Sequence, residues 1–147
     1  MIYRHTQYGT IIIIGVGLFP AAILVHRIIS GCIYPPEWIA AVVLLSALFL
    51  FASLTVEVNQ QRVVCSFGTG LIHKEIPLSD ITDARPVVNS WMAGWGIRWM
   101  PGRYLMWNVS GLQAVELTLK NGGKFRIGTD EPDALVSAIL LNKSAGG

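Results

Sequence analysis

Two apolar runs dominate the first third of the chain. Ile11–Val25 and Trp38–Leu54 contain no charged side chain, and a short polar stretch with two consecutive prolines separates them. A helix needs about 20 residues to cross a hydrocarbon core of ~30 Å, so each run needs its flanking residues to span. We predict a transmembrane helical hairpin over residues 1–56, with helices at about 9–29 and 37–56. Both ends of the chain then lie on one side of the membrane.

From Leu54 onward, apolar and polar residues alternate with the period of two that is typical of β-strands. Pro86 favours an edge position or a bulge for its strand, because it has no N–H to donate to a neighbour. Asn121 and Gly122 predict a type I′ hairpin turn, since both tolerate positive φ. The predicted strands cover residues 54–58, 62–67, 71–76, 81–88, 104–109, 112–119 and 124–127.

The last part of the chain predicts one helix. Asp130 and Pro132 are typical of a helix start, and apolar residues at helical spacing follow as far as Leu141. Seven or so strands followed by one helix predict a mainly-β domain over residues 55–142, an open barrel capped by the C-terminal helix. We expect residues 143–147 to form a disordered tail.

Composition supports a membrane protein with one small domain. Of the 147 residues, 52% are hydrophobic and only 14% are charged, whereas a soluble domain typically has about 25% charged residues. The formal net charge is +2, and the Lys and Arg residues do not line up along any predicted helix or strand. Tracking a phosphate backbone requires such a line of basic residues, so we expect no nucleic-acid partner.

The flanking charges predict the orientation of the hairpin. Arg4, Arg62 and Lys74 lie on the side that holds both termini, whereas Arg27, offset by Glu37, lies on the other. The positive-inside rule then places both termini in the cytoplasm. We therefore predict a two-pass protein of the inner (cytoplasmic) membrane, with membrane lipids as its surroundings.

A lipoprotein signal is the alternative to a retained first helix. The stretch 29–32 is similar to the cleavage box of a bacterial lipoprotein, with Cys32 as the acylated residue. His26 and Arg27 interrupt the apolar run just before this box, where such signals are usually uncharged, and a second apolar run follows. We favour a retained helix. Cys32 and Cys65 would then lie on opposite sides of the membrane and could not pair.

Small residues in the first run offer a helix-packing site. Gly17 and Ala21 lie four residues apart, the spacing that lets two helices approach closely. The second helix of the hairpin or another copy of the chain could occupy this face. Neither run has an Asp, Glu, Lys or Arg at its centre, so we expect no ion or proton pathway.

Three short motifs follow the hairpin: Gly94, Trp95, Gly96, Ile97 and Arg98, then Asn108 and Gly111, and finally Phe125, Arg126, Ile127, Gly128, Thr129, Asp130 and Pro132. Together with the order of a hairpin, strands and a final helix, these residues resemble the bacterial pleckstrin-homology-like membrane proteins. The resemblance covers about residues 54–141 and implies a pleckstrin-homology-like barrel on a membrane anchor, but no reaction. Phosphoinositide binding is not expected, because the turn at 59–62 has a single basic residue.

A tryptophan-rich segment is the most unusual feature after the hairpin. Two interpretations compete: a surface that contacts lipid or a partner protein, or large rings that roof the barrel core. A spacing of four would stack three of the rings on one helical face, but nearby glycines and a proline oppose a regular helix. The candidate interface residues are Trp91, Trp95, Arg98, Trp99, Arg103 and Trp107.

No catalytic, cofactor or metal constellation is recognisable. His5, His26 and His73 are scattered without metal-ligand spacing, and Asp80 and Asp83 have no accompanying nucleophile. Our leading hypothesis is a non-enzymatic module for self-assembly, as a homo-oligomer, or for binding another membrane protein. The alternative is a module that contacts the lipid surface through the tryptophan-rich segment. An enzyme is the least supported class.

Overall fold

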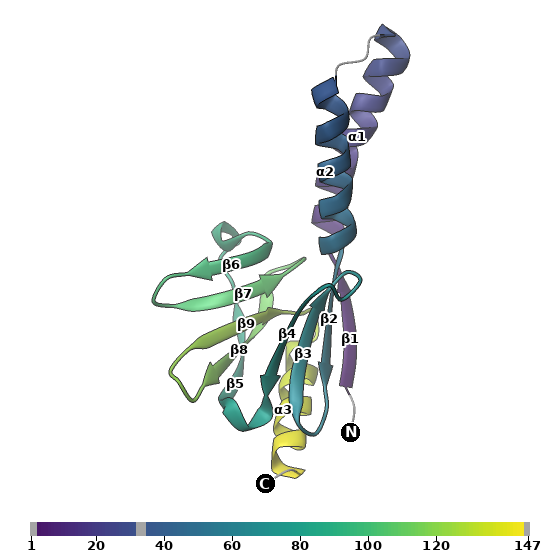
Figure 1. Ribbon diagram of the computed structural model, residues 1–147. Coiled ribbons are helices and arrows are strands. Elements are labelled where there is room, and N and C mark those ends of the chain that lie inside the picture. The colour runs from purple at the N-terminus through teal and green to yellow at the C-terminus, as the bar shows by residue number, and fades with distance from the viewer. Residues whose placement is uncertain (1–2, 32–34, 146–147) are drawn as a thin grey trace.

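The computed structural model describes residues 3–31 and 35–145 of the chain. It is a mixed α/β structure in which two helices project together from one end of a two-sheet domain (Figure 1). The elements are β1 (Tyr3–Tyr8), α1 (Thr10–Ser30), α2 (Pro35–Phe51), β2 (Ser53–Val58), β3 (Arg62–Phe67), β4 (Ile72–Pro77), η1 (Leu78–Asp80), β5 (Ile81–Val88), η2 (Trp91–Ala93), β6 (Gly96–Met100), β7 (Tyr104–Asn108), β8 (Gln113–Leu119), β9 (Lys124–Gly128) and α3 (Pro132–Ala145).

The domain consists of two sheets packed face to face. The four-stranded sheet has the order β1-β2-β3-β4 and the five-stranded sheet the order β5-β8-β9-β7-β6, with only β7 and β9 parallel. Alternating residues of β2 and β3 are buried, because one face of each strand lies on the core and the other faces solvent. The buried rings of Phe67, Trp107 and Phe125 join the two sheets, with centroids 4.9 and 5.8 Å apart.

Helix α3 closes one side of the sandwich. It packs against β2, β5, β8 and η1, and inserts the fully buried side chains of Leu135 and Ile139 into the core. The predicted capping helix is therefore present. It continues to Ala145, so the prediction that a disordered tail begins at 143 was wrong; residues 146 and 147 lie outside the described part of the chain.

The predicted barrel of about seven strands was wrong, because the described residues form nine strands in two sheets. The sequence analysis missed β1, whose polar residues we assigned to the flank of a helix, and β6, whose glycines and tryptophans interrupt the alternation. The second helix also ends earlier than predicted: Thr55 and Val56 lie in β2, where β1 and β3 pair with them on both sides.

The predictions for the Pro86 strand and for the Asn121-Gly122 turn have different outcomes. Of the two alternatives predicted for Pro86, the edge position is confirmed, because β5 is an edge strand and its register shift lies between Ile81 and Asp83. The hairpin between β8 and β9 is also confirmed. Its turn is not type I′, because Gly122 has φ +81° whereas Asn121 has no positive φ. Instead, the Asn121 side chain accepts a hydrogen bond from the Gly123 N–H at 2.9 Å.

Candidate functional site

Helix α1 is the one described helix that is long and apolar enough to cross a membrane. Its 21 residues include an 18-residue window with mean hydropathy 2.2, and they extend about 31 Å at 1.5 Å per residue. None of its side chains is buried in the described structure. A helix that is apolar on every side requires an apolar surrounding, and a bilayer provides one.

Helix α2 lies beside α1, and both helices point away from the domain (Figure 1). At their far end, the Arg27 guanidinium lies 4.8 Å from the centroid of the Trp38 ring. Gly17 does not contribute to this pairing: a Cβ built there meets no described atom within 4 Å, and Ala21 is exposed. The predicted small-residue face is therefore clear of α2.

The hairpin joins the four-stranded sheet without a linker. Gly9 alone separates β1 from α1, and Ala52 alone separates α2 from β2. The Gly9 N–H donates to the Ala52 carbonyl at 2.7 Å, which closes the base of the hairpin. A Cβ at Gly68 would lie 2.6 Å from the Leu50 carbonyl oxygen, so the backbone of the β3–β4 turn packs closely against the end of α2. These contacts fix the domain relative to the helix axis.

This orientation places exposed apolar residues at the end of the domain from which the helices leave. Leu71 lies in the β3–β4 turn that contacts α2, and Leu112 lies in the β7–β8 turn, where the Ser110 hydroxyl is 3.4 Å from that of Thr10. The Asn89 N–H donates to the Leu112 carbonyl at 2.7 Å, which places the end of β5 and the start of η2 beside the β7–β8 turn. We call this group the apolar rim; its members are Leu71, Val88, Trp91, Met92 and Leu112.

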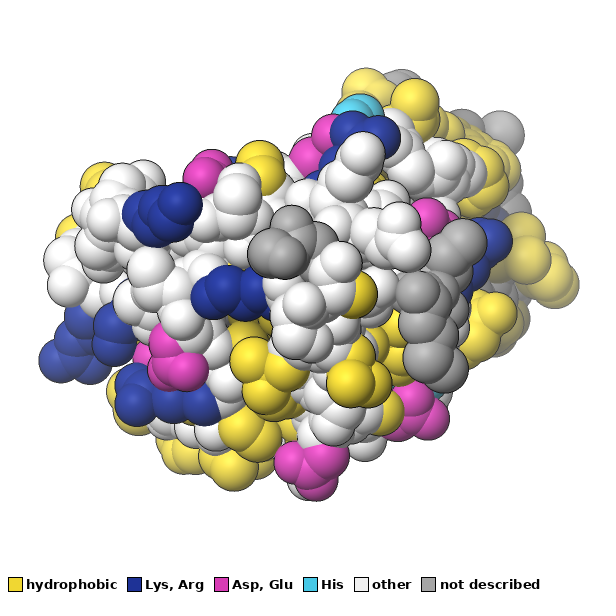
Figure 2. All heavy atoms as spheres, turned by 90° about the horizontal axis from the view of Figure 1, so that it is seen from below, with side chains coloured by type: hydrophobic (Ala, Val, Ile, Leu, Met, Phe, Trp, Pro, Cys, Tyr) yellow, Lys and Arg dark blue, Asp and Glu magenta, His cyan; other side chains and the backbone are white. Residues whose placement is uncertain are grey.

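Trp91 and Met92 are the most exposed members of the rim, at 75% and 77% of their full accessibility. The turn η2 presents them because Ser90 caps it, accepting a hydrogen bond from the Met92 N–H at 3.4 Å, while Ala93 is buried beneath. The opposite end of the domain differs. Lys, Arg, Asp and Glu side chains are interspersed with hydrophobic ones across it in Figure 2, and its β2–β3 turn is Asn-Gln-Gln.

The predicted interface residues do not form one surface. Trp107 is 6% exposed and belongs to the core, whereas Trp99 is 75% exposed on β6. Trp95 is half-buried, and its Nε1 has no hydrogen-bond acceptor among the described residues. Arg103 is exposed in the β6–β7 turn, and Arg98 lies on the opposite face of β6 from Trp99. The rings are not stacked on a helical face, because Trp91 lies in η2 and Trp99 in a strand.

The motif residues that carry the family resemblance have structural roles. The Asn108 side chain donates to the Gly111 carbonyl at 3.1 Å and accepts from the Ser110 N–H at 3.2 Å, which shapes the β7–β8 turn. A Cβ at Gly128 would overlap the Asn108 side chain. The Thr129 hydroxyl accepts from the Glu131 N–H at 3.1 Å and so starts α3.

Two more motif residues, Asp130 and Arg98, make contacts in different parts of the domain. Asp130 approaches His5 of β1, with its Oδ1 2.6 Å from the histidine Nε2, and so ties the first strand to the start of α3. Arg98 lies against Gly94, where a Cβ would be 3.2 Å from the guanidinium. Ile97 and Gly96 complete the motif on β6.

A buried carboxylate on the outer face of the five-stranded sheet escaped the sequence analysis. Glu116 is 1% exposed, and its oxygens lie 2.7 Å from Arg85, 2.7 Å from Arg126 and 3.3 Å from Lys124. Burial alone raises the pKa of Glu116, but hydrogen bonds from the three cations outweigh it and lower the pKa to about 2. Only the strand register reveals this cluster, because it makes Glu116 the direct cross-strand partner of both Arg85 and Arg126.

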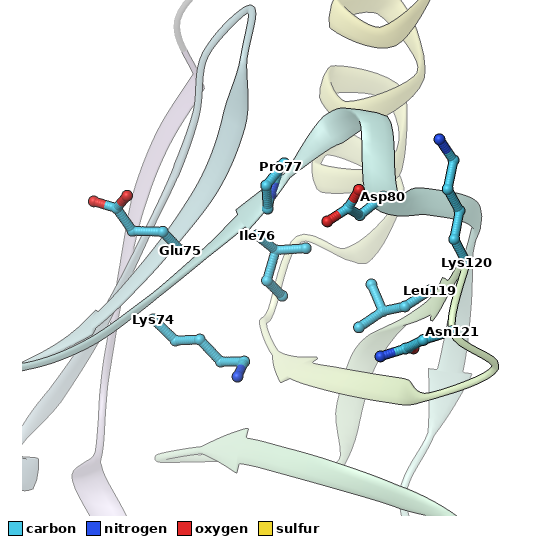
Figure 3. A pocket seen from close by; sticks show the side chains of 8 residues that line it. All are labelled: Lys74, Glu75, Ile76, Pro77, Asp80, Leu119, Lys120 and Asn121. Carbon is cyan, nitrogen blue, oxygen red and sulfur yellow. The ribbon is translucent and has the colours of Figure 1, made fainter.

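Opposite α3, the sandwich stays open along β4. A cavity of about 350 Å³ lies at this side, and Figure 3 shows Lys74 extending into it toward Asn121 while Glu75 points away. The Lys74 ammonium is 5.6 Å from the centroid of the Phe125 ring. We call this opening, together with the strip of β9 and β7 beside it that carries Phe125 and Leu105, the β4 groove. The cavity itself is lined by Lys74, Glu75, Ile76, Pro77, Asp80, Leu119, Lys120 and Asn121.

The remaining chemistry is sparse in the described residues. They contain no group of three or more His, Cys, Asp or Glu side chains that could hold a metal ion. Cys65 is fully buried, which raises the pKa of its thiol to about 12 and makes it unreactive. Cys32, the candidate acylation site, lies outside the described residues.

Comparison with protein-family models gives no match, and comparison with curated proteins gives none either.

Proposed function

We propose that the chain is a two-pass protein of a bacterial inner membrane whose hairpin holds a pleckstrin-homology-like domain against the lipid surface. Both termini lie in the cytoplasm, and the domain acts as a non-enzymatic module. One observation carries the proposal: the single-residue junctions at Gly9 and Ala52 hold the apolar rim at the end where the helices leave. A domain on a flexible linker could turn such a surface away from the bilayer, whereas this one cannot.

The composition of the apolar rim favours lipid as its contact. Trp is enriched at membrane interfaces because its ring is apolar while its N–H remains hydrated. Each exposed rim side chain would gain about 1–2 kcal/mol on burial, so the five together provide a favourable term on the order of 5 kcal/mol. The exposed Arg98 and Arg103 can meet lipid phosphates at the border of this surface.

Self-assembly through the helices is the second candidate function. The observation that favours it is the open face of Gly17 and Ala21, which α2 does not cover. The edges of the four-stranded sheet are unsuitable for a symmetric pair. β1 runs along the helix axis and β4 slants to it (Figure 1), and a two-fold axis that pairs either strand antiparallel with its copy would point the two hairpins in largely opposite directions.

The test compares the apolar rim with an exposed apolar site on α3. The full chain with Cys32→Ser receives a single cysteine at Met92 or at Leu141, which is 60% exposed, and each cysteine carries a bimane fluorophore. The buried Cys65 does not react. In nanodiscs containing brominated lipids, we expect strong quenching at position 92 and none at position 141. Equal quenching at both positions, or none at either, would refute the proposal.

A further inference from the structure

The β4 groove is the place where the two sheets fail to cover one another. α3 fills the opposite side of the sandwich with Leu135 and Ile139. Along β4, no described element takes the corresponding place. As a consequence, the inner face of the five-stranded sheet is covered at one side and uncovered at the other. One row of cross-strand partners runs from buried to exposed in the order Leu117, Phe125, Leu105 and Trp99.

The two walls of the groove have different chemistry. β4 is an edge strand, so one row of its backbone N–H and C=O groups has no strand partner in the described structure. The facing wall is mixed: Asp80, Leu119, Lys120 and Asn121 line the cavity, and beside it lie the buried Phe125 and the half-buried Leu105. An unpaired strand edge beside a partly uncovered row of apolar residues, here Leu105 and Trp99, is an arrangement that accepts an added strand.

Lys74 sets the charge that such a strand must carry. Its side chain points inward from β4 over the Phe125 ring and forms no ion pair with any described carboxylate. Glu75, its neighbour, points away and pairs with Arg62 at 2.6 Å. An inward-facing lysine on an edge strand repels an apolar or basic partner strand, since the ammonium would be desolvated without an anion.

We infer that the β4 groove binds an extended peptide segment of another protein, which adds a fifth strand to β4 and places an acidic side chain on Lys74. Neighbouring inward side chains of the segment pack on Leu105 and Leu119, and Trp99 covers its membrane-proximal end. A second copy does not fit as a symmetric partner, because pairing β4 with β4 would oppose the two hairpins. The inference goes beyond lipid contact and does not depend on it.

The experiment uses the full chain, one copy per nanodisc, and fluorescein-labelled octapeptides. The probe alternates leucine and threonine, with glutamate at the central inward position; its matched control has lysine there. Fluorescence anisotropy, corrected with empty nanodiscs, should show the glutamate peptide binding at least tenfold more tightly. A glutamate peptide N-methylated along its pairing edge should lose at least tenfold in affinity, because the backbone bonds to β4 are blocked.

Variants of the groove decide the result. Lys74→Glu should reverse the preference in favour of the lysine peptide, and Lys74→Met, which keeps the fold without a charge, should abolish the preference. Trp99→Ser should weaken both peptides, whereas Leu140→Ser on α3 should leave them unchanged. Unaltered selectivity in Lys74→Met would overturn the inference.

Two further outcomes would name a different occupant and equally overturn the inference. Sodium oleate that displaces the glutamate peptide and is unaffected by Lys74→Glu would indicate a lipid chain. Peptide binding that vanishes in nanodiscs with two copies would indicate that a second copy covers the groove. The bimane quenching at Met92 is independent of all these readouts, so failure here and failure of the lipid-contact proposal can be told apart.

Discussion

Replacing Glu116 with glutamine tests the buried charge cluster of the five-stranded sheet. The side chain keeps its size but loses its charge, which leaves Arg85, Arg126 and Lys124 close together without an anion. A carboxyl group whose pKa lies at about 2 instead of 4.5 corresponds to about 3 kcal/mol of stability at neutral pH. Arg85 is half exposed and partly screened by solvent. We therefore expect Glu116→Gln to lower the free energy of unfolding by about 2 kcal/mol.

The pH dependence follows from the direction of the same pKa change. Because the pKa of Glu116 is lower in the folded protein, its contribution is complete above pH 4.5 and is lost as the pH falls toward 2. The free energy of unfolding of the native chain should fall over this range by more than that of Glu116→Gln. The two chains should converge near pH 2.

Urea titrations in mild detergent, followed by near-ultraviolet circular dichroism, measure this free energy. Glu75→Gln is the matched control, because Glu75 also pairs with an arginine at 2.6 Å but both partners are almost half exposed. Such a surface pair contributes at most about 1 kcal/mol. Equal losses in Glu116→Gln and Glu75→Gln, or parallel pH profiles for the native chain and Glu116→Gln, would refute the reasoning.

Two further predictions concern the base of the hairpin. Gly68→Ala should cost about 3 kcal/mol, because φ is +48° and the new Cβ would lie 2.6 Å from a carbonyl of α2; Gly70→Ala, with φ +88° and open space, should cost only about 1 kcal/mol in the same urea titration. Replacing residues 9–52 with Asn-Gly should give a folded, water-soluble domain with the native far-ultraviolet dichroism, since Tyr8 and Ser53 are direct cross-strand partners. An insoluble or unfolded product would show that the hairpin is part of the domain core.

The parts of the fold that the sequence predicted are those whose local signals agree with their surroundings. The strand at 62–67 alternates because one face lies on the core. The strand at 113–119 alternates in sequence as well, although both of its faces are buried from Ala114 to Leu117. The helix after Asp130 has both its capping residues and its apolar spacing. The strand β1 had no such signal: Tyr3–Tyr8 is largely polar because it lies at a sheet edge, and only its pairing with β2 makes it a strand.

The tryptophan-rich segment shows why the candidate site could be predicted only in part. Composition identified a stretch with unusual exposed rings, and Trp91 and Trp99 are indeed exposed. The assignment of each ring depends on strand register, because Trp107 pairs with Ile127 in the middle of the sheet while Trp99 lies on its edge strand. Register between distant strands is a tertiary property that residue spacing does not encode.

The position of the hairpin has a consequence for what the anchor can do. Residues 10–51 are inserted between two strands that pair residue by residue from Tyr3↔Val58 to Tyr8↔Ser53. A change in the tilt or separation of α1 and α2 must therefore either move the whole domain or strain the β1–β2 ladder, since one residue on each side leaves no slack. An anchor that served only to retain the domain at the membrane could be attached to either terminus by a flexible linker. In the proposed two-pass arrangement, insertion into the sheet instead keeps the apolar rim and the β4 groove in a constant position relative to the bilayer.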